Sequence, residues 1–212
     1  MENAIRIKSR LNSALEINAI PGHFATSHSH INYYVGISKM KHEHMMAREA
    51  GITLANNYAY VHSIDTIVCM DGSEVIGGFL AQKLSKNDML NYNRQKNIYV
   101  IPPEINNNGQ LIFRDNLEPM VRGKDILLLI ASITTGRTAK HALQCIKYYG
   151  GVAQGIAAVF STVDEINGLK VAHLFSTSDI PNYETYSAKD CPHCAGNEKL
   201  DGLANSFGIS RM

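Results

Sequence analysis

The chain has 212 residues, of which 45% are hydrophobic and 18% are charged, and its formal net charge is +1. This length and composition are typical of a single domain with a full core, and the near-neutral charge argues against nucleic acid or an anionic membrane as the main partner. No segment approaches the roughly 20 apolar residues that cross a bilayer, and the N-terminal stretch lacks the apolar run of a leader peptide. We therefore expect a cytoplasmic protein.

The first segments predict two helices on either side of a histidine-rich stretch. Residues 4–17 place apolar side chains among charged ones at helical spacing, which predicts an amphipathic helix that ends before Pro21 and Gly22. The following histidines, such as the pair His28 and His30, have no cysteine or acidic residue at a spacing that completes a known zinc pattern. A second amphipathic helix is predicted for residues 43–58.

Residues 65–178 alternate between the patterns of strands and helices. Strands are predicted at residues 65–70, 97–101, 111–113, 126–130, 152–160 and 171–175, and helices at residues 75–84 and after Thr138. Such alternation predicts a parallel sheet that is covered by helices on both faces and binds ligands at the carboxyl ends of its strands.

The clearest strand–turn–helix unit is residues 124–151. The apolar run at residues 126–130 and the helix after Thr138 are separated by the turn Ser132-Ile133-Thr134-Thr135-Gly136-Arg137-Thr138. Hydroxyls, a glycine and an arginine at a helix N-terminus are suited to binding a phosphate, because unpaired N–H groups and the positive end of the helix dipole point there. Serine and threonine also cap helices that bind no ligand.

A second candidate anion site lies in the turn Asp71-Gly72-Ser73-Glu74, which follows the strand at residues 65–70. Its glycine and serine open a helix, but Asp71 and Glu74 would repel a diphosphate unless a metal ion or a cation lay between. In the alternative interpretation, Asp71 or Ser73 caps the helix, and Gly77 and Gly78 allow the helix to approach the sheet closely.

The order strand, Ile-Thr-Thr-Gly, helix resembles the loop of type I phosphoribosyltransferases that wraps the 5′-phosphate of phosphoribosyl diphosphate (PRPP). The resemblance implies a phosphate-binding role for Ser132, Thr134, Thr135, Gly136, Arg137 and Thr138 and a role near the diphosphate for Asp71, Gly72 and Ser73. It further implies that a homodimer uses PRPP and Mg²⁺ to attach ribose 5-phosphate to a nucleobase, with release of diphosphate.

The segment HSHINYYVGISK at residues 28–39 is similar to the N-terminal hood of orotate phosphoribosyltransferases, where a serine, paired tyrosines and a later lysine cover the base. The similarity implies that Tyr33, Tyr34 and Lys39 border the nucleobase. The alternative is a half-buried strand whose tyrosines belong to the core or to a dimer surface.

Two positions depart from the family's pattern and leave the catalytic residues unassigned. The adjacent acidic pair that binds the ribose hydroxyls in the family is replaced by Ile130 and Ala131, and residues 101–108, where orotate-type relatives carry a cationic mobile loop, contain no cation. Arg94 and Lys96 are nearby substitutes, or else a solvated pair beside a strand. Ile130 and Ala131 cannot accept a hydrogen bond from a sugar or bind Mg²⁺ through a carboxylate, and a leaving diphosphate develops negative charge that the missing cations would stabilise, so both departures disfavour catalysis. A regulatory protein that binds PRPP or a nucleotide without turnover is therefore the alternative function.

The C-terminal segment contains Cys191-Pro192-His193-Cys194. Zinc normally needs two more ligands than Cys191 and Cys194, and a redox pair normally opens a helix in a thioredoxin-like unit. Similar Cys-Pro-x-Cys segments occur near the C-terminus of some orotate phosphoribosyltransferases. Structural Zn²⁺ at these cysteines, held by one chain or shared across a dimer, is therefore a hypothesis, and a zinc-stapled structural protein is the third candidate function.

These observations predict one α/β domain over residues 1–212, with a type I phosphoribosyltransferase-like, Rossmann-like fold. It would consist of an N-terminal helix and hood segment (1–42), a parallel sheet flanked by helices (43–178) and a cysteine-containing tail (179–212). The predicted function is an orotate-type phosphoribosyltransferase of pyrimidine nucleotide synthesis, with PRPP and a nucleobase as small-molecule substrates.

Overall fold

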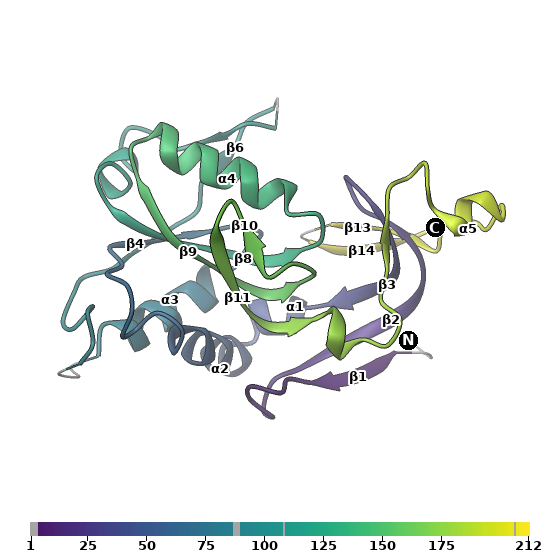
Figure 1. The fold of residues 1–212 in the computed structure, drawn as a ribbon, viewed down its shortest axis with the longest axis horizontal. Coiled ribbons are helices and arrows are strands. Elements are labelled where there is room, and N and C mark those ends of the chain that lie inside the picture. The colour runs from purple at the N-terminus through teal and green to yellow at the C-terminus, as the bar shows by residue number, and fades with distance from the viewer. Residues whose placement is uncertain (1–3, 87–89, 108, 206) are drawn as a thin grey trace.

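The computed structural model describes residues 4–86, 90–107, 109–205 and 207–212. Within them, a mostly parallel core sheet lies beside a second six-stranded sheet, which we call the hood sheet (Figure 1). Residues 1–3 of the predicted N-terminal segment and Asn108 of the predicted cation-free loop lie outside the described residues.

The core sheet has the strand order β10-β11-β9-β8-β4-β5, and its pairs are parallel except for the antiparallel pair of β10 with β11. The bounds of these strands are β4 (Thr66–Cys69), β5 (Tyr99–Ile101), β8 (Asp125–Ile133), β9 (Val152–Ser161), β10 (Glu165–Ile166) and β11 (Leu169–Ser176). This arrangement confirms the parallel sheet predicted from the sequence.

Helices cover both faces of the core sheet, as Figure 1 shows. On one face, α2 (His44–Ala55) and α3 (Glu74–Leu84) pack with Leu127 and Leu129 of β8 in one hydrophobic cluster. On the other face, α4 (Arg137–Tyr148) packs with Ile126, Leu128 and Ile130 in a second cluster. Because the side chains of β8 alternate between the two clusters, the strand is buried on both faces, which explains its unbroken apolar run.

The hood sheet joins the two ends of the chain. Its strand order is β12-β3-β2-β13-β14, and β1 pairs with the first part of β2. The bounds are β1 (Ile5–Lys8), β2 (Glu16–Ala25), β3 (His30–Gly36), β12 (Thr185–Tyr186), β13 (Gly202–Asn205) and β14 (Gly208–Arg211). The sequence predicted a hood near the N-terminus, but it did not predict that the tail completes the same sheet.

The amphipathic helix predicted for residues 4–17 is wrong. These residues form β1, a connecting segment and the start of β2, and Ile7 pairs with Ile17 in an antiparallel register. Ile7 and Ile17 are buried while Arg6 and Lys8 are exposed, so the apolar side chains of β1 and β2 follow the two-residue period of a strand. Strand pairing thus overrode the helical spacing, and Leu11, Ala14 and Leu15 of the apparent helical pattern lie in the segment that connects β1 to β2.

Short elements connect the layers, and the observed end of β8 and start of α4 make the candidate phosphate loop shorter than the sequence predicts. The connecting elements are α1 (Ser38–His42), β6 (Glu104–Ile105), β7 (Leu111–Ile112), α5 (Pro192–Ala195) and two 3-10 turns, Glu118–Met120 and Thr177–Asp179. β8 extends three residues beyond the predicted strand, so Ser132 lies on the strand. Arg137 and Thr138 lie in the first turn of α4 and not in the loop before it.

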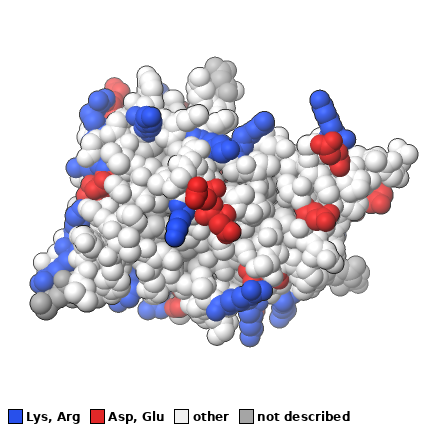
Figure 2. Space-filling view, in the orientation of Figure 1, with Lys and Arg blue, Asp and Glu red and all other residues white. Residues whose placement is uncertain are grey.

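The surface carries charges of both signs. On the face shown in Figure 2, basic and acidic side chains are interspersed among uncharged ones, in agreement with the net charge of +1. In the part of the chain that the structure describes, every helix is too short or too polar to cross a membrane.

Gly77 and Gly78 provide a matched test of the close approach between α3 and the core sheet. A β-carbon on Gly77 would lie 2.5 Å from the Cys69 sulfur, whereas a β-carbon on Gly78 would meet nothing within 4 Å. We expect Gly77→Ala to be less stable than Gly78→Ala by about 1–3 kcal/mol, the usual cost of overpacking. Gly78→Ala should itself gain up to about 1 kcal/mol, because alanine favours a helix. Urea unfolding measures both free energies, and equal values would contradict the close approach.

Candidate active site

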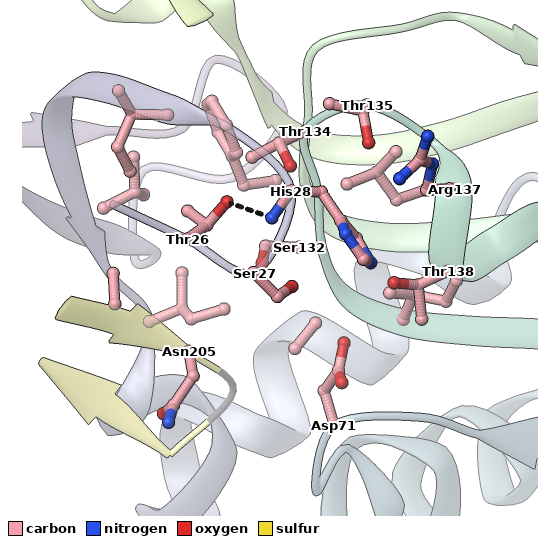
Figure 3. A pocket seen from close by; sticks show the side chains of 18 of the residues that line it. Thr26, Ser27, His28, Asp71, Ser132, Thr134, Thr135, Arg137, Thr138 and Asn205 are labelled. Atoms are coloured by element: carbon pink, nitrogen blue, oxygen red, sulfur yellow. Dashed lines mark hydrogen bonds between the residues drawn. The ribbon is translucent and has the colours of Figure 1, made fainter. Parts of the chain in front are cut away.

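A pocket of about 230 Å³ opens between the carboxyl ends of the core strands and the hood sheet. The strand–turn–helix unit of β8 and α4 forms one wall, the segment from β2 to α1 forms a second, and the residues at the turn between β13 and β14 form a third. In Figure 3, Thr134, Thr135 and Arg137 lie on one side of the pocket, and Asp71 and Asn205 lie on the other. The position agrees with the predicted ligand site at the carboxyl ends of parallel strands.

The turn before α4 has the backbone geometry of an anion site. Gly136 is the N-cap of α4 and has a φ of 71°, a left-handed conformation that glycine adopts without strain. Among the described residues, no side chain caps this helix end, so the N–H groups of its first turn are free of intrahelical and side-chain partners. Thr162 donates a hydrogen bond from its hydroxyl to the carbonyl of Thr134, which ties the turn to the end of β9.

All six predicted phosphate-binding residues line this one pocket. They are Ser132, Thr134, Thr135, Gly136, Arg137 and Thr138. Among the described lining residues, Arg137 is the only one with a permanent positive charge and Asp71 is the only carboxylate. A negatively charged ligand would therefore find N–H groups, hydroxyls and one guanidinium at the same end of the pocket.

The predicted diphosphate region is only partly turned toward the pocket. Asp71 lines the pocket, with a φ of 60°, but Gly72 and Ser73 do not. The Ser73 side chain is buried and donates a hydrogen bond to the carbonyl of Leu129, 3.3 Å away. The Ser73 hydroxyl thus binds the backbone of β8 and does not face the pocket.

Lys41, which no sequence pattern marks, supplies a cation beside this region. Its Nζ donates a hydrogen bond to the backbone carbonyl of Asp71 at 2.6 Å, and its side chain is buried. Burial lowers the pKa of Lys41, and the charges of Asp71 and Glu74 oppose that change. No pattern in the sequence marked the five-residue helix α1, so the inward direction of Lys41 was not predictable.

Burial has the opposite effect on the acid beside this lysine. It raises the pKa of Asp71, Lys41 counteracts this effect, and Glu74 adds to it. The surroundings of Asp71 therefore disfavour its charged form, as is common for functional carboxylates.

Of the three residues predicted to border a base, only Tyr34 lines the pocket. Tyr33, its neighbour on β3, points to the other face of the strand and packs against the core cluster of α2 and α3. Lys39 is exposed and pairs with Glu43 at 3.8 Å. Burial raises the pKa of Tyr34, and a hydrogen bond with Ser38 counteracts it.

Several lining residues were missed because they come from segments distant in the sequence. The hairpin turn between β2 and β3 contributes Thr26, Ser27 and His28, and the C-terminal strands contribute Asn205. These two segments meet because β13 pairs in parallel with the end of β2, where Gly202 lies opposite Phe24. A single sequence offers no local signal for this pairing.

The two departures from the family's pattern have clear structural consequences. Ile130 and Ala131 line the pocket and are almost fully buried, so this wall has no carboxylate for a sugar hydroxyl. Lys96 pairs with Asp65 at 2.9 Å, and Asp65 directly precedes the first residue of β4. Lys96 therefore lies at the N-terminal ends of the core strands, whereas the pocket lies at their carboxyl ends. The interpretation of Lys96 as a substitute cation is thus wrong.

The loop between β5 and β8 adds no cation either. Arg114 forms a two-pronged ion pair with Glu104, with N–O distances of 2.6 and 2.7 Å, which ties β6 to the residues after β7. Cys191 and Cys194 lie outside the pocket, at the start and inside of α5, where they approach two histidines of the hood sheet.

Solved structures that resemble this chain include phosphoribosyltransferases, although no protein-family model and no curated protein sequence matches it. Orotate phosphoribosyltransferase of Mycobacterium tuberculosis, in complex with Fe(III) dicitrate, has a TM-score of 0.53 at 14% identity over 78% of this chain and 93% of that chain. The same enzyme in complex with PRPP has a TM-score of 0.50 at 16% identity, over 69% and 82%. Adenine phosphoribosyltransferase of Rhodothermus marinus has a TM-score of 0.51 at 14% identity, over 76% and 93%.

At 14–16% identity these neighbours indicate a common fold and no more, since one fold can serve several functions. The structure of this chain is therefore the type I phosphoribosyltransferase fold, with a hood sheet that its N-terminal and C-terminal segments build together.

Proposed function

We propose that the protein is an orotate-type phosphoribosyltransferase, which transfers ribose 5-phosphate from PRPP to a nucleobase and releases diphosphate. The observation that carries the proposal is the uncapped N-terminus of α4, which faces a pocket closed by the hood sheet. Free N–H groups, the glycine at position 136 and the guanidinium of Arg137 suit a 5′-phosphate. Tyr34 would border the base across the pocket.

Positive charge lies at the proposed 5′-phosphate position and behind the proposed diphosphate position. Arg137 lines the pocket beside the 5′-phosphate loop, and Lys41 is held against the backbone of the Asp71 turn. In this proposal, Lys41 offsets the charge of a diphosphate near that turn, which the missing cations of the mobile loop cannot do.

Mg²⁺ would find one protein ligand in the pocket. Protein-bound Mg²⁺ is commonly held by one or two carboxylates together with substrate phosphates. Asp71 is the only carboxylate among the described lining residues, so it is the residue that would hold Mg²⁺ beside a diphosphate. Mg²⁺ would supply charge neutralisation for the phosphates when bound.

A regulatory protein that binds PRPP or a nucleotide without turnover is the second candidate function. The apolar surface of Ile130 and Ala131 favours it, because this wall leaves ribose hydroxyls without carboxylate acceptors. The phosphate loop does not depend on that wall, so phosphate binding and turnover can be separated physically.

Titration of PRPP with and without Mg²⁺, followed by a diphosphate-release assay with orotate and other bases, separates the two functions. Binding with base-dependent release supports the transferase. Binding without release for every base favours the regulatory protein. Absence of binding by both PRPP and nucleoside monophosphates would contradict the phosphate-loop assignment itself. The homodimer that the resemblance implies belongs to the same proposal, and light scattering on the purified protein tests it.

Arg137 and Lys140 give a matched pair for the phosphate site. Both are exposed basic residues near the N-terminus of α4, but only Arg137 lines the pocket. Loss of a charged hydrogen bond costs about 1.5–3 kcal/mol, so Arg137→Ala should weaken PRPP binding about tenfold to a hundredfold. Calorimetric titration should find Lys140→Ala within about twofold of the unchanged protein. Equal effects of the two substitutions would indicate general electrostatics in place of a site.

Asp71→Asn should make the protein more stable at neutral pH. Because burial raises the folded-state pKa of Asp71 above its ordinary value of 3.8, folding favours the protonated acid, and this contribution is lost as pH rises through the folded pKa. Asparagine removes the charge and tolerates a positive φ. The Tm gain, about 2–4 °C for each kcal/mol, should be present at pH 7 and should vanish as pH falls below 3.8.

The same substitution should weaken PRPP binding only when Mg²⁺ is present, because Asp71 is the proposed protein ligand of the ion. Asp115→Asn, an exposed residue outside the pocket, serves as the control for both measurements. A Tm gain that is independent of pH would show that the charge of Asp71 is not the cause.

A further inference from the structure

Four potential metal ligands from distant parts of the chain converge beside the hood sheet, outside the pocket. They are His23 on β2, His30 at the start of β3, and Cys191 and Cys194 at α5. Each offers one nitrogen or sulfur atom, and these four atoms lie within 4.8 Å of one another. About 160 residues separate the histidines from the cysteines, so the cluster depends on the tertiary fold and not on a local motif.

The separations of these atoms are close to the edges of a tetrahedral zinc site. His23 Nε2 lies 3.0 Å from His30 Nδ1, and Cys191 and Cys194 place their sulfur atoms 3.5 and 3.6 Å from His23 Nε2. The sulfur of Cys194 lies 3.3 Å from His30 Nδ1. Zinc bonds of about 2.0–2.3 Å in a tetrahedron require nitrogen–nitrogen and nitrogen–sulfur edges of about 3.4–3.6 Å. The two sulfur atoms fit this range in their separations from His23, and the two separations that involve His30 are slightly shorter, so a small shift of the His30 ring would admit the ion.

The surroundings orient His23 for coordination. Its Nδ1 lies 3.2 Å from the carbonyl of Glu198, and because a carbonyl only accepts, Nδ1 must carry the proton. In the neutral ring, Nε2 then has the free electron pair and points at the cluster. Such a hydrogen bond from the second ring nitrogen is the usual support of a zinc-bound histidine.

The backbone around His23 is held on both sides of the residue. Its N–H donates to the carboxylate of Asp201 at 2.8 Å, and its carbonyl accepts from the N–H of Asp201 at 2.8 Å. The ring of His193 stacks on the ring of His23 with 5.1 Å between centroids. His23 and Cys191 are each only 2% exposed, so the cluster is shielded from water on one side.

We infer that His23, His30, Cys191 and Cys194 form a structural Zn²⁺ site within a single chain. Two thiolates and two imidazoles in a closed, tetrahedral arrangement are typical of structural zinc, and both cysteines are free of disulfides. The two thiols release their protons when the ion binds. The missing third and fourth ligands of the Cys-x-x-Cys motif are thus the two hood histidines, and no dimer is required.

The site would fix the hood in place over the pocket. His23 and His30 flank the hairpin turn that contributes Thr26, Ser27 and His28 to the pocket wall. The cysteines precede β13, whose pairing with β2 brings Asn205 to the same pocket. One ion would therefore tie together the two segments that close the pocket, but zinc binding itself does not depend on the proposed transferase function.

Elemental analysis of the purified full-length chain tests the site. We expect close to one zinc per chain, and we expect Cys194→Ser and His30→Ala to lose most of it. Cys145→Ser and His193→Ala are matched controls, because Cys145 lies on α4 and His193 lies between the two cysteines without belonging to the cluster. Both controls should retain the zinc content of the unchanged protein.

Cobalt substitution keeps the test valid if a ligand variant fails to fold. After mild chelation, Co²⁺ added to the unchanged chain should give the visible absorption of a tetrahedral site with thiolate charge transfer, and Zn²⁺ should abolish it. A folded chain without stoichiometric metal, or with a Cys191–Cys194 disulfide in its place, overturns the site. Stoichiometric iron or copper in purified protein overturns the assignment of zinc.

Hydrogen exchange tests the proposed role of the ion. Removing the metal should raise amide exchange in residues 23–31 and 198–205, which meet at the site, while β8 and β9 keep their protection. Unchanged exchange in the first two segments would overturn the role in holding the hood. These readouts need no PRPP, so they stay informative if the proposed function fails.

Discussion

β8 carries its side chains alternately into two hydrophobic clusters, and this constraint positions the rest of the site. Ile126, Leu128 and Ile130 face α4, while Leu127 and Leu129 face α2 and α3. A slip of one residue against β4 or β9 would exchange the two faces, so the register of β8 is fixed. The end of β8, and with it the N-terminus of α4, must therefore lie at the edge of the sheet where the pocket opens.

The hood sheet completes the pocket by a second, independent constraint. A short antiparallel hairpin presents its turn to the pocket, and a two-residue parallel contact between β2 and β13 brings in the C-terminal strands. Two paired residues bury little surface and hold few backbone hydrogen bonds, so this junction needs further support. The proposed zinc site lies beside that junction and would supply the support.

The sequence predicted the core better than the hood for a physical reason. Strands buried on both faces and amphipathic helices leave local patterns, and the residues from Ser132 to Thr138 could be placed together from such patterns alone. The hood has strands with one exposed face, mixed charges and partners far away in the chain. The pattern of residues 4–17 predicts a helix there although they form strands, and no pattern marks Lys41 or Asn205, because only tertiary contacts bring Lys41 to the Asp71 turn and Asn205 to the pocket.

The roles of the histidines also depend on tertiary contacts that the sequence pattern does not reveal. Pairs such as His28 and His30 share one side of a strand in the sequence pattern, yet His28 lines the pocket and His30 belongs to the metal cluster, because the hairpin turn separates them. His23 offered no spacing signal, since its partners are the two cysteines of the tail. A motif with half of its ligands visible is thus a reason to look for the other half elsewhere in the fold.

The apolar wall of the pocket can be understood from the cost of burying charge. Ile130 has no exposed surface and packs within the cluster of α4, so a carboxylate in its place would lose its hydration unless a cation or sugar hydroxyls replaced it. The phosphate loop does not share this dependence, because its N–H groups belong to the backbone of a helix that the core already holds. A phosphate site made of these N–H groups therefore needs no buried charge, whereas ribose recognition through buried carboxylates would lower the free energy of unfolding. Asp71 is the pocket carboxylate whose charge burial disfavours, and in the proposed function a diphosphate and Mg²⁺ would offset that cost.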